Sequence, residues 1–409
     1  MNYDIRTIAL CLTTLCCAAG NATEYDADKA LTYCENKVNA TVDEMKTKNG
    51  SLDYRQVPWH ILKGEKKWDL QEVKIENWTC GFWAGELWYA YEATGDSRLK
   101  KLAESYTLAL DTLVRQPIFD HDLGFLIYCG YGNAYRMTGD KRYGDVIVDA
   151  AKQIATLYRP KVGTILSWPR NVKMFGGHNT IMDNMMNLET LFNAYKLSGN
   201  RHYYDMAVSH AATTMRYHFR PDYSCYHVAV YDTLSGTFKR GVTHQGYADD
   251  TMWARGQSWA IYGYTMVYRE TKDPVFLDFA QKVTDVYLKR LPEDLIPYWD
   301  FDDPKIPNSF RDVSTACIVA SALIELSEYV DHEKGAYYLD MAKRMLNSLD
   351  SETYQSRKKN SAMLLHSVGN LPAGTEIDAS ICYADYYYME ALVRLKNAEQ
   401  GRSITVMVN

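Results

Sequence analysis

The segment AYEATGDSRLKKLA, residues 90–103, sets the pattern of the fold because it returns in altered form along the chain. Four later segments follow the same plan: AYRMTGDKRYGDVI from Ala134, AYKLSGNRHYYDMA from Ala194, VYRETKDPVFLDFA from Val267 and LSEYVDHEKGAYYLDMA from Leu326. Each copy ends one helical pattern on an aromatic residue, turns at Gly or Asp, and begins another helix. Such a repeat indicates a chain built from helical hairpins.

Outside these turns, the apolar periodicity is helical almost throughout. Twelve helices are predicted, with ends good to a few residues, at about 27–47, 77–94, 97–115, 122–138, 141–158, 180–198, 201–218, 250–271, 274–291, 311–330, 334–350 and 377–396. Six hairpins with short turns at one end and long loops at the other predict a closed toroid of helices. We expect one domain over residues 23–409, because nothing within it is typical of a linker.

The long loops are predicted to gather at one end of this toroid, where functional sites are usually built. They cover residues 48–76, 159–179, 219–249, 292–310 and 351–376. Within them, the segment 222–240 alternates aromatic and polar residues and turns at Ser235 and Gly236, which predicts a small β-hairpin.

The formal net charge of −6 gives no electrostatic case for binding nucleic acid or an anionic membrane surface. Residues 1–22 combine Arg6, a short apolar run and small residues up to Ala22, which is typical of a secretory signal peptide. We therefore expect an exported protein, most plausibly periplasmic, with lipid anchoring the less favoured alternative. No later apolar segment is long enough to cross a bilayer.

Six cysteines follow the predicted signal peptide, and their spacing does not suggest a zinc site. They are Cys34, Cys80, Cys129, Cys225, Cys317 and Cys382. Four of them lie in apolar helical segments, where Cys behaves as a small hydrophobic residue. We expect mostly free, buried thiols.

The strongest candidate for chemistry is Asp183, in the stretch SWPRNVKMFGGHNTIMDNMMNLE at residues 167–189. A polar loop there leads into an apolar helix, so the carboxyl group is predicted to be removed from water. Burial raises a carboxyl pKa, and a raised pKa suits a general acid working near neutral pH. An ordinary helix N-cap is the competing interpretation. Asp122 in the tripeptide 120–122 occupies a similar junction before a second helix.

Aromatic residues make up 13% of the chain, including 9 Trp and 33 Tyr, which is more than a helical core normally needs. Aromatic faces stack on the C–H faces of sugars, so a cavity that combines aromatics and acids favours a saccharide ligand. Close packing between helix layers remains the better account of most Tyr residues. In the segment 244–264, Arg255 lies near two Trp residues and is a candidate for binding a substrate carboxylate. Alternatively, Arg255 pairs with Asp249 or Asp250 for structural reasons.

Seven motifs together make the chain similar to the unsaturated glucuronyl hydrolases of glycoside hydrolase family 88. They are NWTCGFWAGELW from Asn77, DHDLGF from Asp120, TIMDNMMN from Thr180, HQGYADDTMWARGQSW from His244, PYWDFDDP from Pro297, DVSTA from Asp312 and IDASICYADYYYMEAL from Ile377. The resemblance covers nearly the whole chain after the signal peptide. It implies an all-α (α/α)6 barrel of six helical hairpins, in agreement with the predicted toroid.

The resemblance also implies roles for particular residues. Asp183 is the implied catalytic acid and base, and Asp122 is its essential partner. The implied substrate-binding residues are His121, His227, Gln245, Trp253, Arg255 and Trp259, followed with less support by Trp78, Trp83, His366, Ser367 and Tyr383. No metal and no organic cofactor is implied.

Such enzymes remove the 4,5-unsaturated uronic acid that polysaccharide lyases leave at the non-reducing end of glycosaminoglycan fragments. The C4=C5 bond is an enol ether of the ring oxygen, so protonation at C4 places positive charge on C5 and O5. Water adds at C5, the hemiketal opens, and the aglycone leaves. If Asp122 is anionic and near, its charge is expected to keep Asp183 protonated at mildly acidic to neutral pH.

Three alternatives stay open at the level of sequence. A sister family acting on unsaturated rhamnogalacturonan shares the fold and parts of the motifs. A sugar epimerase would use a pair of histidines, for which His121, His178, His227 and His244 are candidates. A non-catalytic saccharide-binding protein would keep the aromatic lining without needing two buried acids.

The sequence does not decide the preferred glycosaminoglycan, its sulfation, or the oligomeric state. A short basic run, Arg357, Lys358 and Lys359, either contacts a sulfate or, as the favoured interpretation, is a solvated charge run.

Overall fold

A computed structural model describes residues 25–405 of the chain. Its helices are α1 Ala27–Met45, α2 Phe82–Thr94, α3 Ser97–Ala109, α4 Leu123–Ile127, α5 Asn133–Thr138, α6 Lys141–Ala155, α7 Val172–Phe175, α8 Asn184–Ser198, α9 Arg201–Tyr217, α10 Ala254–Thr271, α11 Pro274–Lys289, α12 Val313–Ser327, α13 His332–Leu349 and α14 Cys382–Glu399. Three short elements, η1 Leu110–Arg115, η2 Tyr128–Gly132 and η3 Pro169–Asn171, are of the 3₁₀ or π type. Because η2 joins α4 to α5 without a break, residues 123–138 act as one helix with a π turn.

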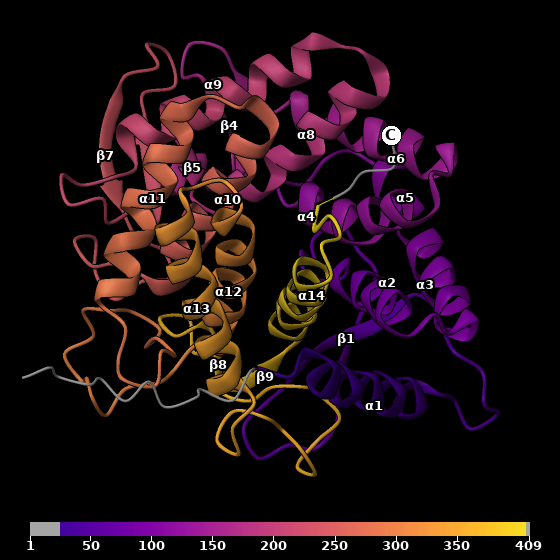
Figure 1. The fold of residues 1–409 in the computed structure, drawn as a ribbon. Coiled ribbons are helices and arrows are strands. Elements are labelled where there is room, and N and C mark those ends of the chain that lie inside the picture. Colours follow the sequence, from indigo (N-terminus) through magenta and orange to yellow (C-terminus); the bar gives the residue numbers. More distant parts are fainter. Residues whose placement is uncertain (1–24, 406–409) are drawn as a thin grey trace, which may run out of the picture.

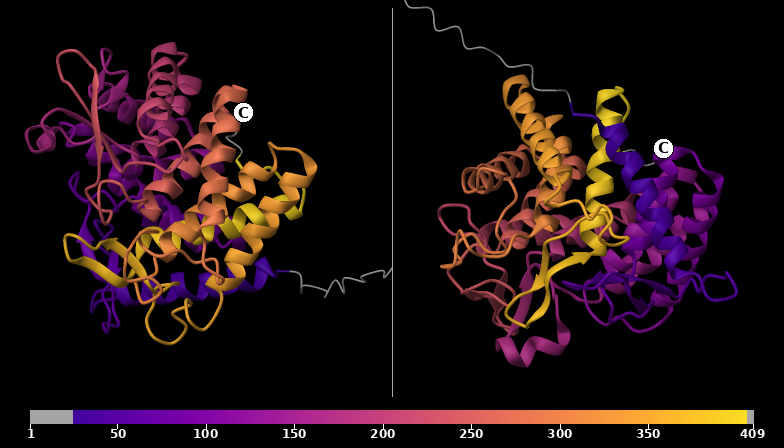
Figure 2. Two further views of the ribbon diagram at one scale, coloured as in Figure 1. Left: turned by 90° about the vertical axis from the view of Figure 1, so that its left-hand side faces the viewer. Right: turned by 90° about the horizontal axis from the view of Figure 1, so that it is seen from below.

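The helices form two concentric rings. The inner ring closes through contacts from α2 to η2, α4 to α8, α8 to α10, α10 to α12, α12 to α14, and α14 back to α2. In Figure 1, α14 lies between α12 and α2 near the centre of the molecule. The outer ring consists of α1, α3, α6, α9, α11 and α13, each packed on an inner helix; the view from below in Figure 2 shows α1 running beside α14. This arrangement is the predicted (α/α)6 barrel.

Which side chains of a helix are buried depends on whether the helix belongs to the inner or the outer ring. Every residue of α12 from Val313 to Leu326 is buried, because inner helices are covered on all sides. The outer helix α6 instead buries a single stripe that includes Val146, Ile147, Ala150 and Ile154, at the spacing of one helix face. One hydrophobic cluster contains residues from Ala27 to Ile404, so the core is continuous along the described chain.

The repeated short turns form for a local chemical reason. Gly95, Gly139 and Gly199 end inner helices in the left-handed conformation, with φ of 72°, 66° and 70°, which glycine adopts without a Cβ clash. The residue that follows each Gly is an Asp or Asn, and its side chain accepts a hydrogen bond from the backbone N–H at the start of the next helix. The motif therefore contains both the stop and the start signal of a hairpin.

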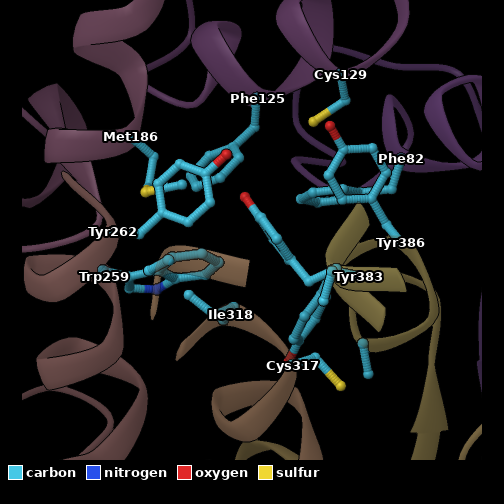
Figure 3. Close-up of a cluster of buried hydrophobic side chains, with 14 of the residues drawn as sticks. Phe82, Phe125, Cys129, Met186, Trp259, Tyr262, Cys317, Ile318, Tyr383 and Tyr386 are labelled. Carbon is cyan, nitrogen blue, oxygen red and sulfur yellow. The ribbon is translucent and has the colours of Figure 1, made fainter. Parts of the chain in front are cut away.

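Aromatic side chains fill the interior of the barrel. Figure 3 shows Phe82, Phe125, Trp259, Tyr262 and Tyr386 converging from four different inner helices. The ring centroids of Phe125 and Trp259 are 5.4 Å apart, and those of Phe82 and Tyr386 are 5.1 Å apart, both within the range of favourable aromatic pairs. Much of the aromatic content is thus core, as expected for most Tyr residues.

Strands occupy the loops at one end of the barrel. They are β1 Gln56–Ile61, β2 Asp69–Glu72, β3 Tyr158–Arg159, β4 Thr164–Ile165, β5 His178–Ile181, β6 Val228–Tyr231, β7 Phe238–Val242, β8 Ser367–Asn370 and β9 Thr375–Ile381. All pairings are antiparallel, in sheets of order β2-β1-β9-β8, β3-β4 and β5-β6-β7. The β6–β7 pair is the predicted hairpin within residues 222–240.

Two predicted helix starts were wrong because strands precede the helices. Residues 180 and 181 belong to β5, and α8 begins only at Asn184. Residues 377–381 belong to β9, and α14 begins at Cys382. The partner of β5 is β6, more than 45 residues away, so local periodicity carried no sign of that strand. Strand β9 forms a hairpin with β8 and also pairs with the distant β1, and the hairpin was not predicted from the sequence.

The six cysteines from Cys34 to Cys382 are free and buried, as predicted. Within residues 25–405, none of the helices is both long and apolar enough to cross a membrane. The predicted signal peptide, residues 1–22, lies outside the described residues.

Candidate active site

A cavity of about 180 Å³ opens at the loop end of the barrel, where the inner helices α4, α8, α10 and α12 begin. Both predicted acids line it, together with residues from loops that are far apart in sequence. The lining residues are Trp78, Asp122, Trp168, Arg170, Asn171, Ile181, Asp183, His244, Gln245, Arg255 and Asn370. The barrel therefore brings Asp122, Asp183, Gln245, Arg255 and Trp78 of the predicted set into one cavity.

Asp183 stands at the junction of β5 and α8. It occupies the N-cap position of α8, but its side chain accepts no capping hydrogen bond. Asp312, at the N-cap of α12, shows the contrast because its carboxylate accepts from the backbone N–H of Ser314. The N-cap interpretation therefore does not explain why Asp183 is an acid. Only 8% of Asp183 is exposed, so its carboxyl group is largely withdrawn from water.

Asp122 stands at the equivalent position before α4 and also makes no capping hydrogen bond. Its backbone N–H donates to Oδ1 of Asp120 at 3.0 Å, and Oδ2 of Asp120 accepts from Arg170 at 2.6 Å. The Asp120–Arg170 pair thus fixes the backbone that carries Asp122. The two catalytic candidates lie at equivalent loop–helix junctions of neighbouring inner helices, since α4 and α8 are in contact.

Burial perturbs both acids in the same direction. It raises the pKa of Asp183 to about 6, although Arg255 and Trp259 act in the opposite direction. The pKa of Asp122 is raised well above its ordinary value by burial and then by the charges of Asp120 and Asp183. The prediction that the charge of Asp122 holds the proton on Asp183 was wrong, because desolvation is the main cause of the raised pKa. Two interacting acids of this kind titrate as a pair.

Each acid faces a buried histidine. Nε2 of His227 lies 3.6 Å from Oδ2 of Asp183, and Nε2 of His121 lies 3.4 Å from Oδ1 of Asp122. Nδ1 of His227 accepts from the backbone N–H groups of His244 and Gln245, so the ring proton is on Nε2, which faces the carboxyl group. Burial lowers the pKa of His121 to about 3 and that of His227 well below its ordinary value, which keeps both rings neutral.

Arg255 lies in the first turn of α10, and its guanidinium is nearly fully buried. Nη1 donates to Oδ2 of Asp312 at 2.8 Å and to the carbonyl of Val368 at 2.5 Å, while Nη2 donates to the carbonyl of Gly369. The predicted alternative partners Asp249 and Asp250 were therefore wrong. The partner in the folded protein is Asp312. Part of the guanidinium group that was predicted to bind a substrate carboxylate is therefore already hydrogen-bonded within the protein.

Several predicted sugar contacts lie just beneath the cavity and do not line it. Trp253 packs on His227 with ring centroids 4.4 Å apart, and Tyr383 packs on Trp78 at 5.1 Å. Trp259 interacts with Asp183 from the barrel core, and Ser367 is fully buried at the start of β8. His121 and His227 belong to this same supporting layer. These residues do not line the cavity themselves but pack against or interact with side chains that do.

Three other histidine and tryptophan candidates lie elsewhere. The Trp83 ring packs edge-on against Tyr106 of α3, between the inner and outer rings of helices. His366 lines a separate cavity, where its Nδ1 lies 2.5 Å from Oδ1 of Asp378. His178 hydrogen-bonds Thr164 and Thr180 inside the β5 region. The structure therefore does not place Trp83 and His366 with the acids.

Four aromatic or polar cavity residues, besides the apolar Ile181, were missed by reasoning from sequence. Trp168 forms a wall of the cavity and contacts the rings of His121, His227 and His244. Arg170, Asn171 and Asn370 contribute polar groups from two loops. The only sequence signal for the first three was their proximity to Asp183 in the stretch 167–189, and Asn370 had none.

Comparisons with known proteins agree on one family. The profile of Glycosyl Hydrolase Family 88 matches residues 37–409. The chain is 45% identical over 333 residues to an unsaturated glucuronyl hydrolase of Formosa agariphila, covering 80% of this chain and 82% of that protein. It is 34% identical over 322 residues to an unsaturated chondroitin disaccharide hydrolase of Streptococcus pneumoniae, covering 78% and 81%.

The fold is also matched by solved structures. A crystal structure described as an unsaturated glucuronyl hydrolase specific for heparin superposes with a TM-score of 0.84 at 39% identity, covering 91% of this chain and 98% of that one. An unsaturated glucuronyl hydrolase from Bacillus sp. GL1 superposes with a TM-score of 0.83 at 28% identity, covering 91% and 97%. With the profile spanning nearly the whole described chain and the acids set in one cavity, the protein belongs to Glycosyl Hydrolase Family 88.

Proposed function

We propose that this glycoside hydrolase removes a 4,5-unsaturated uronic acid from the non-reducing end of lyase-generated glycosaminoglycan oligosaccharides. The observation that carries the proposal is the pair Asp122 and Asp183, which share one cavity, are largely buried, and make no capping hydrogen bond. A buried carboxyl group whose pKa is raised to about 6 supplies a proton near neutral pH, which an ordinary surface Asp does not.

In the proposed reaction Asp183 gives its proton to C4 of the unsaturated ring. The electron pair of the C4=C5 bond forms the new C–H bond, and positive charge develops on C5 and the ring oxygen. A water molecule adds at C5 and returns a proton to Asp183. This proton restores the acid. The hemiketal then opens as the C5–O5 bond breaks, C5 becomes a ketone and the hydroxyl proton passes to O5. The hemiacetal left at C1 expels the aglycone as an alcohol and forms an aldehyde.

The remaining polar side chains have supporting roles in this scheme. The Nδ1 atom of His121 accepts from the side-chain amide of Asn187, so His121, like His227, carries its ring proton on Nε2. Both neutral rings thus place an N–H group beside an acid without adding charge. Trp168 and Trp78 offer aromatic walls against which the sugar ring packs. Arg255 lies beside the acid and its charge lowers the pKa of Asp183, which limits how far burial raises that pKa.

The names of the relatives support a glucuronyl substrate over a rhamnogalacturonyl one, because they are called unsaturated glucuronyl and chondroitin disaccharide hydrolases. The geometry weighs against the epimerase alternative. A histidine that moves a proton near neutral pH needs a pKa near that range, whereas burial lowers the pKa of His121 and of His178 to about 3. A protein that only binds saccharides has no need for two buried acids that do not cap their helices.

The test is incubation of the purified protein with an unsaturated glucuronyl disaccharide. We expect the ultraviolet absorbance of the double bond to disappear as the aglycone is released. A saturated glucuronide of the same aglycone is the matched control, because it has no C4=C5 bond to protonate and should be inert. Comparable release from both substrates would assign the protein to conventional glycosidases, and binding without loss of absorbance would leave only a saccharide-binding function.

We also infer that the protein is exported, most plausibly to the periplasm, because residues 1–22 have the composition of a signal peptide. Fractionation of cells that express the full chain, or the chain without these residues, tests this. Only the full chain should leave the cytoplasm, and it should do so with residues 1–22 removed.

A further inference from the structure

The cavity contains two cationic side chains, Arg255 and Arg170, that differ in how much of their charge is available. Arg255 is 1% exposed and is tied to Asp312 and two backbone carbonyls. The side chain of Arg170 is 45% exposed and makes one ion pair, to Asp120. An anionic group that enters the cavity therefore meets Arg170 as the cation that still faces solvent.

Arg170 is held in a fixed pose although it is exposed. Its Nη1 donates to Oδ2 of Asp120 at 2.6 Å, and its guanidinium lies over the ring of Phe119 at 4.3 Å from the centroid. Among residues 25–405, no partner is found for its Nε–H and Nη2–H groups, which leaves donors for a ligand. A guanidinium that is pinned at one corner and stacked on a ring loses little entropy on binding an oxyanion.

The charge of Arg170 reaches the reacting groups. It opposes the effect of burial on the pKa of Asp122, and it acts with burial to lower the pKa of both His121 and His244. The amide side chains of Asn171 and Asn370 line the same cavity as Arg170 and add further hydrogen-bonding groups. The nearest carboxylate, Asp120, is buried behind Arg170 with only 4% of the residue exposed, so it does not repel a ligand from the front.

We propose that Arg170 binds an anionic oxygen group of the substrate at the mouth of the cavity, either the uronate carboxylate or a sulfate ester on the sugar. The proposal rests on the proposed function. It assigns to a loop residue the anion recognition that the sequence had suggested for Arg255.

The experiment compares Arg170→Gln, which removes the charge, with Arg170→Lys, which keeps the charge but loses the planar fork. Arg201→Gln is the matched control, because Arg201 also stacks on an aromatic ring, Tyr204 at 4.3 Å, and pairs with an Asp at 2.9 Å, yet does not line the cavity. Each variant is assayed on one unsaturated disaccharide without sulfate and on its sulfated counterpart. Affinity for both sugars is also measured by calorimetry in an Asp183→Asn background, where turnover does not interfere.

For Arg170→Gln we expect KM and Kd to rise about 10- to 100-fold, the loss typical of removing a charged hydrogen-bond pair. A rise on both sugars identifies the carboxylate as the ligand, and a rise on the sulfated sugar alone identifies the sulfate ester. Arg170→Lys should fall between wild type and Arg170→Gln. Wild-type KM should increase with salt concentration, and KM of Arg170→Gln should respond less.

The proposal is overturned if KM and Kd of Arg170→Gln stay within twofold of wild type on both sugars. It is equally overturned if the substitution lowers only kcat and shifts its pH profile, because Arg170 would then act through Asp120 on the position of Asp122. Loss of the proposed function itself has a different signature, since wild-type protein would then show no turnover of either sugar.

Discussion

Two sets of buried carboxyl groups in the barrel interior differ in their partners: the catalytic candidates at the loop end, and the glutamates around Arg269 at the other end. At the loop end, Asp122 and Asp183 line the cavity, and no ion pair joins either one to an Arg or Lys in the described chain. At the end with the short turns, Arg269 pairs with Glu189, with Glu270 at 3.0 Å and with Glu325 at 3.0 Å. Burial raises the pKa of Glu270, but the charges of Arg269 and Lys196 outweigh this effect and lower it overall.

The presence of a paired cation separates the two sets, although Asp312 and Asp120 at the loop end are also paired, with Arg255 and Arg170. Buried acids that are paired with arginine hold segments of the chain together. Buried acids without such a partner keep their protons and are typical of catalytic sites. The same barrel therefore uses buried carboxyl groups to hold helices together around Arg269 and, in our proposal, to transfer protons in the cavity.

The largest expected effect comes from removing the unpaired acids. Asp183→Asn and Asp122→Asn should fold normally and lose about 10²- to 10⁴-fold in kcat, the usual contribution of general acid–base catalysis. Steady-state kinetics and circular dichroism on the same samples measure this. A variant with near wild-type turnover and a normal spectrum would remove that residue from the mechanism.

Removing the paired cation should act on stability instead. Arg269→Met leaves three glutamates buried near one another and should lower the free energy of unfolding by about 3–5 kcal/mol, while kcat per folded molecule stays close to wild type. Denaturant titration gives the stability. The control is Arg142→Gln, which removes an exposed arginine paired with Asp140 at 2.6 Å and should change the free energy of unfolding far less, because exposed ion pairs contribute little. Equal losses for the two variants would contradict the contrast between the ends.

The pH dependence of stability should reveal the cost of ionising Asp183. Its pKa in the folded state, about 6, is above the ordinary 3.8, so the folded protein binds this proton more tightly than the unfolded chain does. The resulting stabilisation is complete below about pH 4 and is lost as the pH rises through about 6. Asp183→Asn avoids the buried charge, so it should be more stable than wild type at pH 7.5, by up to about 3 kcal/mol. Thermal unfolding of both proteins from pH 4 to 8 measures the difference, which should shrink toward pH 4. A constant difference across that range would refute the assignment.

The smallest effect is expected at Arg255, which combines features of both ends because it lines the cavity yet is paired. Arg255→Lys keeps one charge for Asp312 but loses hydrogen bonds to the carbonyls of Val368 and Gly369, so the free energy of unfolding should fall by about 1–3 kcal/mol. KM should change less than about twofold if these contacts account for its role. A tenfold higher KM with unchanged melting temperature would instead restore Arg255 as the group that binds the substrate carboxylate.

Local sequence patterns were enough to predict the hairpins and the two acids. The turns around Gly95 and Gly139 carry their stop and start signals within five residues, because helix ends are decided by local backbone conformation and capping. Asp122 and Asp183 were found because each stands where a polar loop meets an apolar helix, and the chain there is enough to predict burial. Closure of six hairpins into a ring followed from their number and from the alternation of short and long connections.

The way in which the long loops meet could not be predicted from local patterns, because it depends on how the helices assemble. Arg255 finds Asp312 across 57 residues, and Arg170 finds Asp120 across 50, because ion pairs between loops depend on which loops the barrel brings together. Strand β5 likewise exists only through β6, which lies more than 45 residues away, since a strand completes its backbone hydrogen bonds on another segment. Strand β9 pairs with its neighbour β8 on one side and with the distant β1 on the other. A local sequence pattern identifies helices, because their backbone hydrogen bonds form within the element itself. Contacts between distant loops shape the cavity and decide which arginine stays accessible to a ligand, and these contacts form only in the assembled barrel.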